Sequence, residues 1–233
     1  MGFIDDIKED RDLQIQTACV AFFLLIFPLY FFSVAAGTVS PAGMGGVGTY
    51  SVSGEITYID FESGEEDIAD GSPLVIDLNT DALDDIADKN IVGVLVSMSY
   101  QEDETEEGTA FIPCATGSLS ADTITGTASH LNFSNSADGE NGGGNGAHDV
   151  TTGWYNSSMI GEDIEGLSES EIAEQLDSNG AGLGDYTIEI SVTANSQNSP
   201  GCTRSDSGET VSYTIQLIIL DYTIIPFVDI ENI

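Results

Sequence analysis

Alternating apolar and polar positions predict strands over residues 91–100, 185–194 and 210–220. A period of two is the pattern of a strand that buries one face and exposes the other. Further strands are expected over residues 50–61 and 73–78, which are rich in apolar and β-branched residues. The inward-facing residues expected for the three long strands are Val92, Val94, Val96, Met98, Tyr100, Tyr186, Ile188, Ile190, Val192, Ala194, Val211, Tyr213, Ile215, Leu217 and Ile219.

Two short helices are expected between the strands. Ser168 and Glu171 have the spacing of a capping box, which predicts a helix of two to three turns from this point. A second short helix is expected over residues 80–90, capped by Thr80 or Asp81.

Polar stretches between these elements predict loops. Residues 134–149 are dominated by Gly, Asn and Ser and indicate a low-complexity surface loop. The acidic stretch 101–108 predicts a turn, and residues 122–133 predict one more strand with a kink at Gly126. Gly54 is expected to mark a bulge or bend in the first strand.

An uncharged apolar segment lies near the N-terminus, over residues 17–37. At about 1.5 Å per residue it is long enough to cross a hydrocarbon layer of about 30 Å. Lys8 and Arg11 precede it and the next base is Lys89, so the positive-inside rule predicts a cytoplasmic N-terminus. The predicted organisation is a cytoplasmic segment over residues 1–12, a transmembrane anchor over 13–37, a flexible stalk over 38–49 and an acidic exterior domain over 50–233.

Two alternatives to an anchor stay open. A cleaved secretory signal fits the small residues Val34 and Ala36, although its leading segment would be acidic and its apolar core longer than usual. The layout also resembles type IV pilin-like subunits, which have a charged leader, an apolar helix and a β-rich head. Here the Lys-Gly or Arg-Gly processing site is absent, and Gln14 and Gln16 stand where such subunits carry Glu.

The density of strands predicts an antiparallel β-sandwich. Residues 182–194, followed by a last alternating strand, resemble the closing strands of immunoglobulin-like exterior domains of the polycystic-kidney-disease and fibronectin types. The resemblance implies that Tyr186 is a corner tyrosine, while the only Trp, Trp154, lies outside the usual Cys–Trp–Cys pattern. The predicted fold is mainly β, with one N-terminal transmembrane helix followed by an immunoglobulin-like sandwich with one or two short inserted helices.

Charge narrows the possible partners. The 233 residues contain 40 acidic and four basic side chains, for a formal net charge of -36. Nucleic acids and anionic lipid surfaces are bound through Lys and Arg, so this composition argues against both. It is compatible with solubility in a salty exterior, with binding of calcium or magnesium, and with a basic partner.

The cysteines are Cys19, Cys114 and Cys202. Cys19 falls in the apolar segment, where it would pack against neighbours or carry a lipid. If the later region is outside the cell, we expect a disulfide between Cys114 and Cys202. In a reducing compartment both would be free thiols.

The sequence shows no recognisable catalytic set. His130 and His148 are the only histidines, and no GxSxG, HExxH or Walker-type motif occurs. We therefore expect no enzymatic activity and no cofactor, and interpret His130 as a packed or surface residue. A calcium site in the polar loop, next to His148, is the alternative to a solvated loop. Its candidate ligands are Asp138, Glu140, Asn141, Asn145 and Asp149.

Asn132 and Asn156 begin N-glycosylation triplets. The function expected from the sequence is that of a membrane-anchored exterior structural or recognition protein of the cell envelope, without catalysis. Its expected partners are the lipid bilayer and other membrane or envelope proteins, contacted through the anchor or the sandwich. The alternative is a filament subunit assembled through its N-terminal helix.

Overall fold

The computed structural model describes residues 20, 22, 23, 46–108, 120–142, 144–196 and 202–227. All pairings between strands in these residues are antiparallel. The larger sheet contains, in spatial order, β7 (Asn145–Gly153), β3 (Ile91–Gln101), β11 (Gly208–Pro226), β1 (Gly48–Ala69) and β8 (Asp163–Leu167). The smaller sheet contains β2 (Leu74–Asn79), β9 (Asp185–Thr193), β5 (Thr123–His130) and β6 (Phe133–Glu140).

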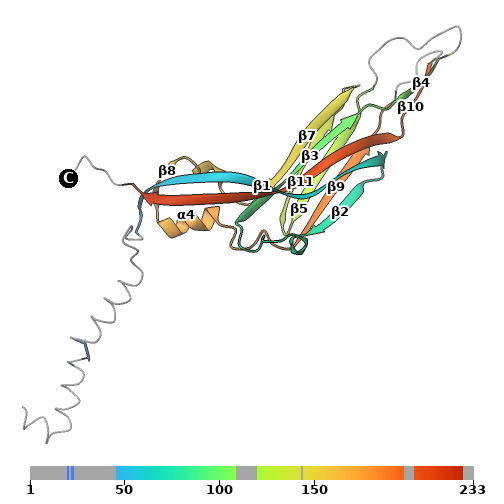
Figure 1. The fold of residues 1–233 in the computed structure, drawn as a ribbon. Helices are drawn as coiled ribbons and strands as arrows, with labels where there is room; N and C mark the ends of the chain where they lie inside the picture. The colour runs from blue at the N-terminus through green and yellow to red at the C-terminus, as the bar shows by residue number, and fades with distance from the viewer. Residues whose placement is uncertain are drawn as a thin grey trace, which may run out of the picture.

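The two sheets face each other as a β-sandwich, and a two-stranded arm projects from one end of it (Figure 1). The arm pairs β4 (Thr105–Gly108) with β10 (Cys202–Ser205). The remaining described elements are the helix α4 (Glu169–Leu176) and the 3-10 turns η2 (Thr80–Ala82) and η3 (Ser157–Met159). The prediction of a mainly β, antiparallel sandwich is therefore confirmed.

Alternating side chains from both sheets form the sandwich core. Val94 and Ile215 of the larger sheet and Ile188 of the smaller sheet are fully buried. These residues belong to the faces that the sequence predicts to be inward. Burial of aliphatic side chains at about 25 cal/mol per Å² is the main force that holds the two sheets together.

The strands β1 and β11 continue beyond the sandwich as a long two-stranded ribbon (Figure 1). There the ribbon packs on α4 and η3 and is bordered by β8, which makes a second, smaller core. Its buried members are Tyr50, Val52, Val92, Met159, Ile172, Leu176, Ile218 and Leu220. The prediction of a bulge at Gly54 is wrong, because the register between β1 and β11 shifts between Asp60 and Glu62 instead.

The capping box at the start of α4 is confirmed. The Glu171 N–H donates to the Ser168 hydroxyl at 3.3 Å, and the Ser168 N–H donates to a Glu171 carboxylate oxygen at 2.7 Å. These bonds satisfy backbone donors that the first turn of a helix leaves without intrahelical partners.

The prediction of a second inserted helix over residues 80–90 is wrong. Asn79 caps only the single 3-10 turn η2, by accepting the Asp81 N–H at 2.7 Å. Asp85 then adopts the left-handed region with a φ of 56°, which an α-helix cannot accommodate. One α-helix, α4, is therefore inserted among the described strands.

The transmembrane part of the fold prediction is also corrected. A membrane span needs about 20 apolar residues in a helix, whereas α4 has eight. In the part of the chain that the structure describes, no helix has the length and apolar character needed to cross a bilayer. The segment 13–37, for which the span was predicted, lies outside the described residues except for Val20, Phe22 and Phe23.

The polar stretch 134–149 is a pair of strands rather than the predicted loop. It forms β6 and the first half of β7, which lie at the edges of the two sheets. On the exposed face of β6, the Thr125 hydroxyl donates to Asp138 at 2.7 Å and the Thr127 hydroxyl donates to Ser136 at 3.0 Å. Backbone pairing and these cross-strand bonds replace apolar burial as the reason for strand formation.

Candidate functional site

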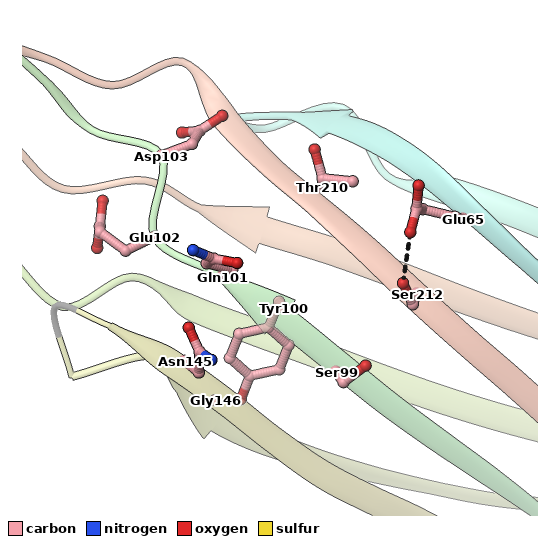
Figure 2. A pocket seen from close by; sticks show the side chains of 10 residues that line it. All are labelled: Glu65, Ser99, Tyr100, Gln101, Glu102, Asp103, Asn145, Gly146, Thr210 and Ser212. Carbon is pink, nitrogen blue, oxygen red and sulfur yellow. Dashed lines mark hydrogen bonds between the residues drawn. The ribbon is translucent and has the colours of Figure 1, made fainter.

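A groove of about 470 Å³ runs along the larger sheet near the arm (Figure 2). Its walls come from β1, β3, β7 and β11 and from the segment that follows β3. The lining residues are Glu65, Ser99, Tyr100, Gln101, Glu102, Asp103, Asn145, Gly146, Thr210 and Ser212. Three of them are acidic, so the groove favours cations over anions.

Glu102 also belongs to a group of carboxylates that closes the sandwich at this end. We call this group the acidic cap and define it as Glu102, Asp122, Asp206 and Glu209. One ligand oxygen from each residue lies within 4.8 Å of the others. Asp122 and Glu209 are 0% and 1% exposed, whereas Glu102 and Asp206 are half-buried, so the cap extends from the interior of the sandwich toward its surface.

Strand geometry explains why three of these acids meet. Glu102 lies two residues beyond the inward Tyr100 of β3, and Glu209 lies two residues before the inward Val211 of β11. Asp122 lies two residues before the buried Ile124 of β5. Side chains two apart point to the same side of a strand, so each acid continues a row of core positions.

A signal in the sequence could therefore have located these acids. Extending the alternation of each strand by one step places a carboxylate in line with buried apolar residues. The predicted strand over residues 91–100 ended before Glu102, which was assigned to the acidic turn, and the predicted strand over residues 210–220 began one residue after Glu209. Asp122 was included in the predicted strand over residues 122–133, but it was not identified as an inward-facing residue. Asp206 has no such signal, because it lies in the connection between β10 and β11.

Three of the four cap carboxylates accept hydrogen bonds from the rest of the protein through only one of their two oxygens. The Glu104 N–H donates to Glu102 at 3.0 Å, and the Gly208 N–H donates to Asp206 at 3.1 Å. The Asn141 amide donates to Glu209 at 2.9 Å. The second oxygens of these three acids are Glu102 Oε2, Asp206 Oδ2 and Glu209 Oε2, which are buried and have no hydrogen-bond partner.

Asp122 is the better-satisfied member of the cap. One of its carboxylate oxygens accepts the Asn195 N–H, and the other accepts the Asn141 side-chain amide at 3.2 Å. Asn141 also accepts the Asp122 N–H at 2.9 Å. Asn141 therefore bridges Asp122 and Glu209 and fixes the positions of both carboxylates.

The environment disfavours ionisation of three cap residues, Glu102, Asp206 and Glu209. Burial, followed by the nearby Asp122, raises the pKa of Glu209 to about 9. Burial, with Asp122 and Asp103 adding to it, raises the pKa of Asp206 to about 6. Burial also raises the pKa of Glu102. Like charges held together away from water have this effect because each ionised group opposes the next.

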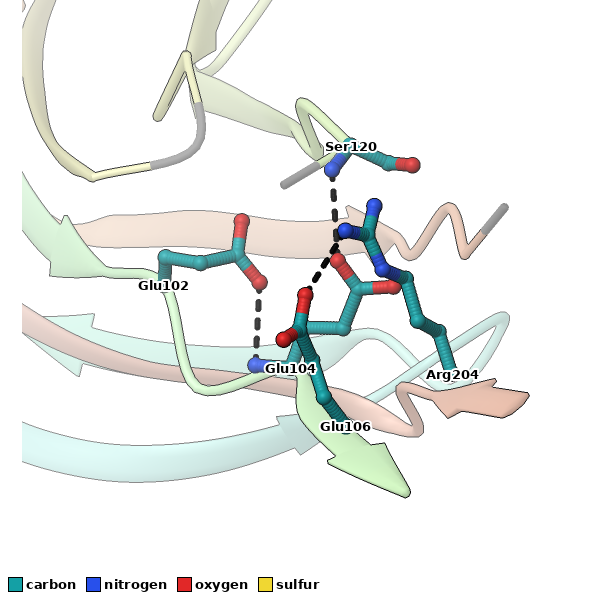
Figure 3. A network of polar contacts seen from close by, with 5 residues as sticks. All are labelled: Glu102, Glu104, Glu106, Ser120 and Arg204. Carbon is teal, nitrogen blue, oxygen red and sulfur yellow. Dashed lines mark hydrogen bonds and ion pairs between the residues drawn. The ribbon is translucent and has the colours of Figure 1, made fainter. Parts of the chain in front are cut away.

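The arm begins directly beside the cap (Figure 3). Glu104, which follows Glu102 by two residues, accepts the Ser120 N–H at 3.2 Å. On the arm itself, Arg204 of β10 pairs with Glu106 of β4 at 2.7 Å, across a directly opposed register position. This ion pair links the two arm strands.

The structure places the sequence-predicted calcium ligands apart. Asp138 and Glu140 are exposed on β6, and Asn145 and Asp149 are exposed on β7. Asn141 alone is buried, between β6 and β7, where it supports the acidic cap. Among the described residues, the acidic cap is the group of acidic, histidine or cysteine side chains that meets the distances of a metal site.

The two histidines have structural surroundings. His130 is buried, stacks on Tyr186 with ring centroids 4.0 Å apart, and lies against Trp154. The Tyr186 hydroxyl donates to the Gly182 carbonyl at 2.6 Å, which is the bond of a corner tyrosine. The Nδ1 atom of His148 lies 3.2 Å from the hydroxyl oxygen of Tyr100.

The candidate residues for glycosylation and for the disulfide lie in different surroundings. Asn132 is exposed in the turn between β5 and β6, whereas the Asn156 amide donates to Gln175 of α4 at 2.9 Å. Cys202 is buried at the start of β10, and Cys114 lies outside the described residues. The pairing of Cys114 with Cys202 stays a prediction.

Comparison with known proteins gives no family for this chain. No protein-family model matches it, and no curated protein matches it. Among solved structures it is similar to a chain from Desmodium yellow mottle tymovirus, with 10% sequence identity and a TM-score of 0.25 over 82% of this chain and 96% of that chain. A likeness at this TM-score supports no inference about the present chain.

Proposed function

We propose that this chain is a membrane-attached protein of the cell exterior with a structural or recognition role and without catalysis. The observation that carries the proposal is the long ribbon of β1 and β11, which separates the tip where the first strand begins from the sandwich and its arm (Figure 1). A domain of this shape presents its arm at a distance from the point where its first strand begins.

The charge of the chain supports the exterior assignment. Its 40 acidic residues outnumber the basic ones tenfold, and such a surface stays soluble where salt screens its self-repulsion. Within this proposal, Cys114 and Cys202 form a disulfide, and the sandwich is of the immunoglobulin-like kind. The corner-tyrosine bond of Tyr186 supports that relationship.

The exterior location is tested by protease treatment of intact cells. Peptides from β3 to β11 should be released before lysis, while a cytoplasmic marker stays intact. Protection of these peptides until the cells are lysed would overturn the proposal. In the same samples, non-reducing peptide mapping should find Cys114 linked to Cys202, and alkylation of both as free thiols would contradict the disulfide.

A filament subunit is the second candidate, and one observation favours it. Val47, Ile225 and Phe227 are 73%, 56% and 57% exposed at the tip of the ribbon, where the Phe227 N–H donates to Thr49. Apolar side chains gathered at one tip suit contact with another subunit. Negative-stain images of the native envelope should show filaments that a specific antibody decorates if this candidate holds.

A further inference from the structure

The acidic cap contains buried carboxyl groups whose hydrogen-bonding capacity the protein leaves incompletely satisfied. Glu209 is 1% exposed, and its Oε2 atom has no hydrogen-bond partner. Glu102 and Asp206 each contribute one more buried oxygen without a partner. Buried carboxylates are normally paired with a cation or fully hydrogen-bonded, so the cap lacks the compensation that its burial requires.

The spacing of the cap suits one particular kind of compensation. Calcium binds oxygen ligands at about 2.3–2.6 Å, so two ligands on opposite sides of one ion lie about 4.8 Å apart. One ligand oxygen from each cap residue falls within 4.8 Å of the others. We propose that the acidic cap is a calcium site in which Glu102, Asp122, Asp206 and Glu209 are the protein ligands.

The ligand chemistry supports calcium over a softer metal. All four side chains offer carboxylate oxygen, which is the preferred donor of a hard cation. Asp122 can join the site although both its oxygens accept hydrogen bonds, because each carboxylate oxygen has a second lone pair. Asn141, which binds both Asp122 and Glu209, is a positioning residue that keeps two ligands in place.

The positions of the ligands indicate what the ion would do. Glu102 lies where the chain leaves β3 for the arm, and Asp206 lies where it returns from β10. Glu209 and Asp122 lie at the ends of β11 and β5, in opposite sheets of the sandwich. One ion would therefore join both crossings of the arm to both sheets. This inference does not depend on the proposed exterior function.

Calcium titration of the full-length chain tests the site. After removal of divalent ions with a chelator, isothermal titration with calcium chloride at fixed ionic strength should give one ion per chain. We expect a dissociation constant of about 10⁻⁴ M or lower, because sites on extracellular modules reach about 10⁻⁴–10⁻³ M. Magnesium chloride should bind at least tenfold more weakly, and equal affinity would overturn the assignment to calcium.

Matched variants test whether calcium binds to the acidic cap or to the acidic surface in general. Glu209→Gln should weaken calcium binding at least tenfold, while Asp149→Asn, an exposed acid on β7, should leave it unchanged. Near-ultraviolet circular dichroism checks that both variants fold. If Glu209→Gln does not fold, Asp206→Asn in the connection before β11 makes the same comparison. Absence of binding to the unmodified chain, or equal binding by the cap variant, would overturn the proposal.

Discussion

The same two strands, β1 and β11, pass through two regions that bury them in different ways. In the sandwich, the smaller sheet covers one face of these strands, and residues such as Ile215 join a core drawn from both sheets. In the ribbon, one short helix, one 3-10 turn and a five-residue strand provide the cover. Continuous hydrogen bonding therefore does not imply uniform stability. We expect the extent of burial to decide which region opens first.

The largest effects are expected when one buried side chain in the sandwich core, or one in the ribbon core, is replaced by alanine. Ile188→Ala in the sandwich should lower the free energy of global unfolding by about 2–5 kcal/mol, because Ile188 is fully buried between the sheets. Leu176→Ala in α4 removes an equally buried side chain of the ribbon core. Its loss should appear first as local opening of the ribbon.

Hydrogen exchange measured on both variants distinguishes global from local opening. With Leu176→Ala, protection should fall in α4, β8 and the outer half of β1 while β9 and β5 stay protected. If protection fell equally in all strands, sandwich and ribbon would be one cooperative unit, and the comparison would be wrong.

A second test concerns the arm end of the sandwich in calcium-free buffer. The raised pKa of Glu209, about 9, means that the folded state holds a proton that the unfolded state releases near pH 4.5. The contribution of Glu209 to stability is therefore full below about pH 4.5 and falls as the pH rises toward 9, by about 2.5 kcal/mol between pH 5 and 7. Asp206 adds to this trend between pH 4 and 6.

Chemical denaturation at a series of pH values measures this effect. Glu209→Gln should flatten the profile above pH 6, because glutamine carries no proton that titrates there. Asp149→Asn serves as the control and should leave the profile as it is. A profile of the unmodified chain that is flat from pH 5 to 8 would contradict the expected burial of the cap.

A smaller effect is expected at the capping box of the ribbon. Ser168→Ala removes the acceptor for the Glu171 N–H and should cost about 1 kcal/mol. The loss should appear as faster hydrogen exchange in the first turn of α4. Glu174→Ala, at an exposed position of the same helix, is the control and should not raise exchange rates in the first turn. If the two variants behaved alike, the cap would not contribute to the stability of the ribbon.

The smallest expected effect is a difference in glycan occupancy between Asn132 on the sandwich and Asn156 beside the ribbon helix. Asn132 lies exposed at the end of the sandwich, whereas Asn156 is tied to Gln175 on the ribbon helix. If the host glycosylates this chain, glycopeptide mapping should find higher occupancy at Asn132. Replacing Gln175 by Ala frees the Asn156 amide and should raise occupancy there. Higher occupancy at Asn156 in the unmodified chain would contradict this order.

Alternation along the chain predicted the sandwich because β9, the second half of β3 and part of β11 bury every second residue in an apolar core. It could not predict β6, whose side chains are polar and whose stability comes from pairing with β5 and from bonds such as Thr125 to Asp138. The helix expected over residues 80–90 failed because composition does not reveal the left-handed backbone of Asp85.

The acidic cap shows a different limit of prediction. Its members lie up to about a hundred residues apart in the sequence and meet only because β3, β5 and β11 end at the same level of the sandwich. Extended alternation identifies three of the four acids as inward-facing, but their mutual distance depends on strand register and sheet packing. Of the five candidate ligands identified in the polar stretch, Asn141 is the one that the structure shows bonded to the cap.

The register of the ribbon also sets how the molecule responds to force. Tyr50 lies opposite Pro226 at the tip, and the pairing continues without a break to Asp60 opposite Gln216. Tension applied between the start of β1 and the end of β11 would unzip these pairs one at a time, at low force. Tension between the start of β1 and the arm would instead load many of the same hydrogen bonds in shear, so the ribbon would be weak in one pulling direction and strong in the other.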